Sequence, residues 1–217
     1  MSARRLARPG TALLHRLREP APPQPECCAF CGQGVPPSHR HLVDTEEQNL
    51  TCVCTACALL FRRPGAAGGR YRHVPDRHLT EPDPGHRIDE RAWAALGIPV
   101  GTAFLFRNAR QDRLVLLYPG PGGATESEPD EAAWRAALGG SRLAAVLEPD
   151  VEALLLRRTD AGIHCLLVPI DTCYELVGRL RRCWKGFDGG AEARAELDAF
   201  FARLAERARP LREDVPG

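Results

Sequence analysis

Nine cysteines are the residues in this 217-residue chain best suited to chemistry, and six of them lie close together near the N-terminus. Two pairs have the spacing Cys-x-x-Cys: Cys28 with Cys31, and Cys54 with Cys57. Two residues between thiolates let a tight turn aim both sulfurs at one ion, and Gly32 allows the positive φ that such a knuckle often needs. Two facing pairs make a closed tetrahedron of four sulfurs, which Zn²⁺ prefers. The spacing therefore predicts one zinc site.

Neighbouring residues offer alternative ligands, and iron is the alternative metal. Cys27 and Cys52 adjoin the pairs, and His39 and His41 lie in the segment between them. Any of these can replace one cysteine of the four, although a surface or hydrogen-bonded position is the simpler expectation for each histidine. Four thiolates also hold iron in rubredoxin-like sites, so the ligands alone do not separate the two metals. Reduced, buried thiols that pack as small hydrophobes would not account for two such pairs.

The first 25 residues predict a basic segment that ends in a proline-rich linker. They carry five arginines against one acid, their apolar run is too short for a signal peptide, and no small-residue cleavage site follows it. A membrane-spanning helix needs roughly 18 to 20 consecutive apolar residues. No stretch of the chain approaches that length, so no membrane span is expected. A reducing, cytoplasmic location follows, in which disulfides are rare and metal binding is the better explanation of the cysteines.

Alternation of apolar residues indicates the elements that position the pairs. His39, His41 and Val43 alternate along one predicted strand, and residues 50–54 alternate along the next. The two knuckles are therefore expected at the ends of a short hairpin, as in a zinc ribbon. This module, residues 26–61, is too small for a full hydrophobic core and should depend on its metal to fold.

The rest of the chain predicts an α+β domain, with a linker or cover over residues 62–87, the domain itself over 88–208 and a tail over 209–217. Two hairpins are expected to form an antiparallel sheet covered by helices. The hairpin strands fall at residues 102–107 with 113–118 and 151–158 with 163–168, and the helices at 89–97, 131–138, 172–184 and 191–208. Asp171 is the expected cap of the third helix.

Charge gives little support to nucleic-acid binding. The 29 basic and 28 acidic residues leave a formal net charge of +1, so any such binding needs a local patch. Residues 62–87 hold six arginines but also three acids. A solvated loop is the more ordinary interpretation of that strip, and binding of nucleic acid is not expected.

Candidate catalytic groups are weak. Residues 122–128 (GGATESE) have glycines and hydroxyls but lack the lysine and spacing of a phosphate-binding loop, so a capped helix start is expected there. Cys173 lies near a predicted helix start, where its pKa would fall, yet its spacing from Val177 and Leu180 is that of a core thiol. No catalytic residue is assigned, and the chain is not expected to be an enzyme.

Several strings together resemble an uncharacterised actinobacterial domain family of about 200 residues that is associated with gene clusters for high-affinity uptake NiFe-hydrogenases. Besides the two pairs, they are residues 39–44 (HRHLVD), 70–75 (RYRHVP), 123–127 (GATES), 147–154 (LEPDVEAL), 174–178 (YELVG) and 184–190 (WKGFDGG). The resemblance covers residues 26–208. It implies a hydrogenase subunit or maturation factor as the protein partner, and no activity.

These observations together predict a non-catalytic, metal-binding accessory or interaction protein, plausibly one that assists a NiFe-hydrogenase. The alternatives are a rubredoxin-like iron electron carrier and a nucleic-acid-binding zinc ribbon.

Overall fold

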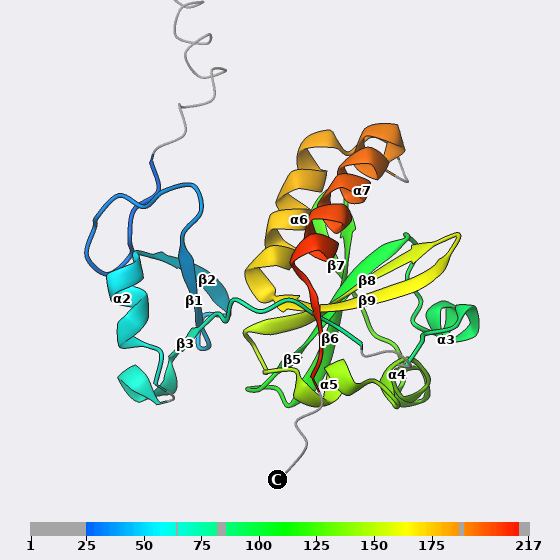
Figure 1. Cartoon of the computed structure of the whole chain (residues 1–217), viewed down its shortest axis with the longest axis horizontal. Coiled ribbons are helices and arrows are strands. Elements are labelled where there is room, and N and C mark those ends of the chain that lie inside the picture. The colour runs from blue at the N-terminus through cyan, green and yellow to red at the C-terminus, as the bar shows by residue number, and fades with distance from the viewer. Residues whose placement is uncertain (1–24, 64, 82–85, 187–188, 213–217) are drawn as a thin grey trace, which may run out of the picture.

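The computed structural model describes residues 25–63, 65–81, 86–186 and 189–212. The predicted basic segment therefore lies almost wholly outside the described residues. Figure 1 shows a small N-terminal module beside a larger body that holds the main sheet. Within the described parts of the chain, no helix combines the length and apolar character needed to cross a membrane.

The N-terminal module is a three-stranded antiparallel sheet with one short helix. The strands are ordered β2-β1-β3, and Leu42 and Val53 are fully buried on one face of the hairpin. Its elements are β1 (Arg40–Asp44), β2 (Asn49–Val53), α2 (Thr55–Leu60), the 3-10 turn η1 (Ala66–Gly69) and β3 (Tyr71–His73). Residues that alternate with Leu42 and Val53 lie on the opposite face, toward the body.

The body is built on a seven-stranded sheet ordered β10-β4-β9-β8-β5-β6-β7, in which neighbours run antiparallel except β10 and β4. The strands are β4 (Leu79–Thr80), β5 (Thr102–Asn108), β6 (Arg113–Gly120), β7 (Gly123–Ser127), β8 (Glu152–Thr159), β9 (Gly162–Pro169) and β10 (Arg209–Pro210). The helices are α3 (Glu90–Ala95), α4 (Glu131–Leu138), α5 (Arg142–Val146), α6 (Ile170–Cys183) and α7 (Gly190–Arg207).

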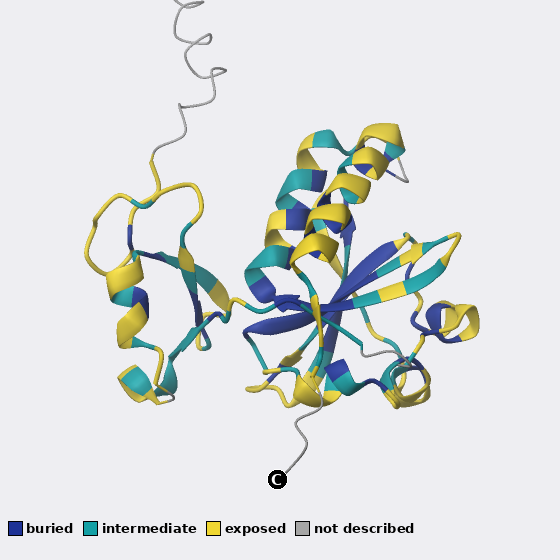
Figure 2. Cartoon of the chain, viewed as in Figure 1, coloured by how far each residue is buried: buried dark blue, intermediate teal, exposed yellow. Residues whose placement is uncertain are grey.

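Helices cover both faces of this sheet, which makes the central strands apolar on both sides. Leu154 and Leu156 pack toward α3, α4 and α5, while Leu155 between them packs toward α6 and α7. Figure 2 shows the buried residues gathered at the centre of the sheet, where five of the eight residues of β8 and five of the seven residues of β5 are buried. A continuous apolar run replaces strict alternation because neither face of β8 meets water.

The predicted α+β class and its regular elements are confirmed. Both hairpins form, α4 has the predicted bounds, and α3 begins after Asp89, whose carboxylate accepts a hydrogen bond from the Ala92 amide at 2.7 Å. The sheet is larger than two hairpins, since β4, β7 and β10 extend it.

Two local expectations were wrong, and one helix was not predicted. Residues 123–127 form strand β7 instead of a helix start, because they pair with β6 across a tight turn at Gly123, whose φ is 128°. Helix α6 begins at Ile170 after Pro169, so Asp171 lies within the first turn and caps nothing. Residues 142–146 form α5, which no prediction included.

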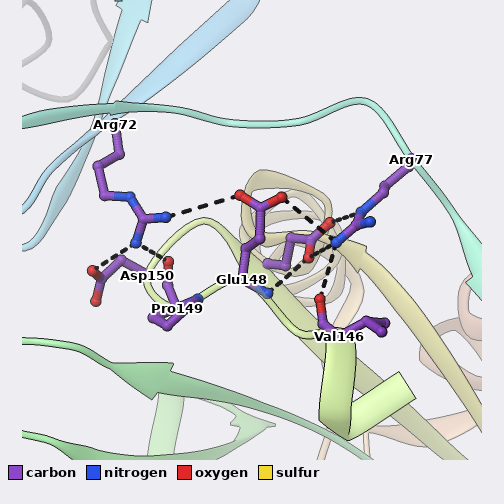
Figure 3. A network of polar contacts seen from close by, with 7 residues as sticks. Arg72, Arg77, Val146, Glu148, Pro149 and Asp150 are labelled. Atoms are coloured by element: carbon purple, nitrogen blue, oxygen red, sulfur yellow. Dashed lines mark hydrogen bonds and ion pairs between the residues drawn. The ribbon is translucent and has the colours of Figure 1, made fainter. Parts of the chain in front are cut away.

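The module is joined to the body by apolar packing and by arginines that donate hydrogen bonds to groups of the body. Val43 of β1 belongs to the same buried cluster as Phe104 and Leu176. Arg72 donates to the Pro149 carbonyl at 2.5 Å, one of the contacts drawn in Figure 3. The segment after β3 is therefore fixed to the body.

A buried carboxylate anchors the same junction. Glu152 is fully buried and accepts two hydrogen bonds from Arg77, at 2.5 and 2.8 Å, and one from the Glu148 amide at 2.9 Å. Arg77 also donates to the Val146 carbonyl at 3.0 Å (Figure 3). These bonds satisfy a charge that burial would otherwise make very unfavourable.

Candidate metal centre

The first cysteine pair lies in a backbone knuckle. The Cys28 amide donates to the Gln33 carbonyl and the Gly32 amide to the Cys28 carbonyl, each at 2.8 Å. Gly32 has φ 72°, the left-handed conformation expected of the glycine after the pair. The knuckle is attached to the hairpin because the Ala29 amide donates to the Cys52 carbonyl at 2.9 Å.

The second pair starts a helix instead of forming a second knuckle. Cys54 is the N-cap of α2, and its sulfur accepts a hydrogen bond from the Cys57 amide at 3.4 Å. The spacing Cys-x-x-Cys suits both geometries, since residues three apart share one helix face. The four cysteines are therefore carried by a knuckle, a hairpin and a helix N-terminus. The prediction of a second knuckle at Cys54 and Cys57 was wrong.

The four sulfurs lie close enough for one ion. The Sγ atoms of Cys28, Cys31, Cys54 and Cys57 are all within 4.8 Å of one another, and the Sγ atoms of Cys31 and Cys54 are 3.8 Å apart. A regular tetrahedron with Zn–S bonds of about 2.3 Å has sulfur–sulfur edges of about 3.8 Å. The donor set therefore fits one tetrahedral metal ion, and the four cysteines can bind it.

Electrostatics around these sulfurs favours a bound cation. Burial acts to raise the pKa of the Cys28 thiol, but backbone amides led by that of Cys54 donate to it and bring the pKa down to about 6. Hydrogen bonding with the Cys54 side chain is the main cause that raises the pKa of Cys57, to about 12. Cys28 therefore favours the thiolate form that binds a metal, whereas Cys57 holds a proton that a metal would displace on binding.

The alternative ligands do not join this group. Cys27 is exposed, and its sulfur donates to the Pro25 carbonyl at 3.5 Å. His39, His41 and Cys52 form a second group, whose ligand atoms also lie within 4.8 Å of one another. The two groups have no residue in common.

Sequence reasoning missed the acidic partner of the second group. His41 Nδ1 lies 2.9 Å from Asp171 Oδ2, although the two residues are 130 positions apart. No local pattern links residues at that separation. The only signal was the acid at a helix start, which favours a cap just as well.

Aromatic and apolar side chains surround the knuckle and α2. Phe30, between Cys28 and Cys31, contacts Phe61 and Tyr71 with ring centroids 5.0 and 5.1 Å apart. Leu59 and Leu60 on α2 are 54% and 72% exposed. We call Phe30, Leu59 and Leu60 the apolar surface of the module.

Three arginines of the strip, Arg70, Arg72 and Arg77, are engaged within the protein. Arg70 donates to the buried Asp44 carboxylate at 2.7 and 3.0 Å, and this ion pair lowers the pKa of Asp44. Arg72 and Arg77 bind the body as described above. Arginines that neutralise internal acids are poor phosphate ligands, which weakens the nucleic-acid alternative.

The remaining chemical candidate in the sequence, Cys173, is a core thiol. Its side chain is fully buried between α6 and the sheet. Burial, with a smaller contribution from Asp171, raises its pKa well above the usual value. A reactive cysteine needs the opposite conditions, exposure and a stabilised thiolate.

The comparisons with known proteins give a family and no activity. No curated protein and no solved structure matches the chain. A model described as a family of unknown function (DUF5947) matches residues 27–208. That range contains both cysteine pairs, the second group and nearly all of the body, and it agrees with the predicted uncharacterised domain of about 200 residues. The chain belongs to this family of unknown function.

Proposed function

We propose that Cys28, Cys31, Cys54 and Cys57 hold one structural Zn²⁺, and that the module folded by this ion is the interaction unit of a non-catalytic accessory protein. The observation that carries the proposal is the tetrahedral spacing of four sulfurs from two separate elements. Four protein thiolates complete the coordination of zinc, as in structural sites. Thiolate ligands require a reducing compartment, which the predicted cytoplasmic location supplies.

The small core of the module supports a structural role for the ion. Its buried apolar cluster consists of Cys28, Leu42, Val53 and Ala58. Such a cluster buries too little surface to offset the conformational entropy of ordering the knuckle and α2. Metal binding would contribute the missing free energy of folding.

The apolar surface supports the interaction role. Phe30, Leu59 and Leu60 are exposed on the two elements that carry the ligands. Exposed aromatic and apolar side chains would offer anchors for a protein contact. The ion would hold the knuckle and helix in register, so that the surface depends on the metal.

The partner we propose is a NiFe-hydrogenase subunit or maturation factor, on the strength of the family resemblance of the sequence. The tagged protein is expressed in its native host and captured material is quantified by mass spectrometry. Leu60→Asp should reduce recovery of hydrogenase proteins at least tenfold. Val146→Asp, which changes an exposed apolar residue of the body, is the matched control and should leave recovery unchanged. A deletion strain with normal hydrogenase activity would contradict this partner.

Metal analysis of protein from the native host tests the ion. Cys54→Ser should remove one equivalent of zinc relative to the unchanged chain, and Cys27→Ser none. Loss of iron together with visible thiolate charge-transfer bands would instead support the rubredoxin-like electron carrier. Equal metal content in all three proteins would refute the four-cysteine site.

A further inference from the structure

A polar cleft of about 780 Å³ separates the module from α6 of the body. His39 and His41 line it from the module, and Asp171 and Glu175 line it from α6. The same two histidines belong to the second group of potential ligands. The cleft is thus a place where an ion could reach groups from both parts of the protein.

His39 is held with a free nitrogen lone pair in a buried position. Its side chain is only 5% exposed, and Nδ1 lies 2.8 Å from the Pro36 carbonyl oxygen. A carbonyl only accepts hydrogen bonds, so Nδ1 carries a proton, and in the neutral imidazole Nε2 then carries the lone pair. Nε2 is buried and has no hydrogen-bond partner among the residues that the structure describes. Buried polar atoms without partners are rare, and a bound ligand would satisfy this nitrogen.

His41 has the orientation typical of a metal-binding histidine. Nδ1 donates to Asp171 Oδ2 at 2.9 Å, which in the neutral imidazole leaves the lone pair on Nε2. A carboxylate bonded to the far nitrogen fixes the ring and increases its basicity, as in many zinc sites. Asp171 supplies this from α6, so the body helps to orient a ligand of the module.

Strand geometry brings Cys52 to the same place. Cys52 of β2 pairs directly with His41 of β1, and His39 lies two residues before His41 on the same face. The imidazole ring centroids are 4.6 Å apart. One ring nitrogen from each histidine and the Cys52 sulfur all lie within 4.8 Å of one another.

We propose that His39, His41 and Cys52 form a second metal site, distinct from the four-cysteine centre, for a divalent ion such as Zn²⁺. Two imidazole nitrogens and one thiolate are ligands that zinc favours. Three protein ligands leave a fourth position for water or for a donor atom of another molecule. The two histidines line the cleft, which gives such a molecule access to the ion.

The test is a titration of the full-length, metal-free protein with Co²⁺, followed by absorption spectroscopy and elemental analysis after dialysis. The unchanged chain should bind two equivalents. Cys52→Ser and His39→Ala should each bind one and keep the cobalt spectrum of four thiolates, which also shows that the module is folded. Cys27→Ser, a neighbouring cysteine outside both groups, should still bind two.

Other outcomes separate the two sites. Saturation at one equivalent that is lost in Cys54→Ser and retained in Cys52→Ser would overturn the second site and leave the four-cysteine site intact. Two equivalents in both Cys52→Ser and His39→Ala would also overturn it. Retention of one cobalt ion by Cys54→Ser, with its absorption lost on further change of His39, would support the second site alone.

Discussion

His41 of β1 and Asp171 of α6 form a hydrogen bond of 2.9 Å between Nδ1 and Oδ2, across 130 residues of sequence. The bond joins the module to the first turn of α6 in the body. Together with the contacts of Arg72 in β3 and of Arg77 in the segment after β3, it fixes the module against the body. A change of metal state in the module therefore has a direct polar connection to α6.

Removal of metal by a chelator should unfold the module and leave most of the body folded. Within the module, only the small cluster around Leu42 and Val53 would remain to hold the knuckle and α2, whereas the body keeps two large clusters. Hydrogen exchange read by mass spectrometry should show lost protection over residues 27–61 and retained protection in β5 and β8. Full protection of the module in metal-free protein would contradict its dependence on an ion.

Arg77→Met should destabilise the protein by about 3 to 5 kcal/mol, because it leaves the buried Glu152 carboxylate without its partner. Urea unfolding at neutral pH measures the change. Arg113→Met breaks an exposed ion pair with Glu126 and, as the matched control, should cost about 1 kcal/mol or less. The added change Glu152→Gln should recover part of the loss in Arg77→Met, since no unpaired charge is then buried. Similar losses in Arg77→Met and Arg113→Met would argue against this account.

The free energy of unfolding should decrease as the pH falls, and His78 should account for part of that decrease. Burial, followed by the nearby Arg207 charge, lowers the pKa of His78 below the ordinary value of 6.5. In the unfolded chain His78 takes up a proton near pH 6.5, but in the folded protein it does so only at lower pH. Its contribution to stability is therefore complete above pH 6.5 and is lost as the pH falls through the folded-state pKa.

The variant His78→Leu isolates that contribution. Urea unfolding between pH 8 and pH 5 should show a shallower pH dependence for the variant than for the unchanged chain. An NMR titration of the His78 ring gives the folded-state pKa directly. A value above 6.5, or parallel curves for the two proteins, would rule the effect out.

Cys173 should resist alkylation, in contrast to Cys27. Cys173 is fully buried with a raised pKa, whereas Cys27 is exposed. With metal present, brief iodoacetamide treatment and peptide mass spectrometry should label Cys27 at least a hundredfold more than Cys173. Comparable labelling of both thiols would mean that α6 opens from the sheet on the time scale of the reaction.

Sequence patterns predicted those elements that carry their own local signals. Asp89 and Asp130 cap α3 and α4 as acidic residues before good helix formers, and long apolar runs specify β5, β8 and β9. The two pairs could be predicted as a four-sulfur group because spacing alone brings each pair together. The spacing could not predict whether the second pair forms a knuckle or a helix start, because both structures place residues three apart on one side.

The remaining parts depend on tertiary context. Strands β4 and β10 have only two residues each, too few for any periodic signal, and they form because β9 offers an unpaired edge. The GATES segment of β7 contains residues typical of turns, and pairing with β6 decides its conformation. Asp171 and His41 meet only because α6 packs against the β1 hairpin, a relationship that no window of sequence contains.

The parallel pairing of β10 with β4 has a consequence for the order in which the chain folds. Leu79 pairs with Leu167 and with Arg209, so this edge closes only after two long loops have lost their conformational freedom. The module instead joins residues 28 to 73 through short loops. Contacts between distant residues form slowly, and the hairpin of β1 and β2 should therefore reach its native state in an early kinetic phase, before the edge strands close in a later one.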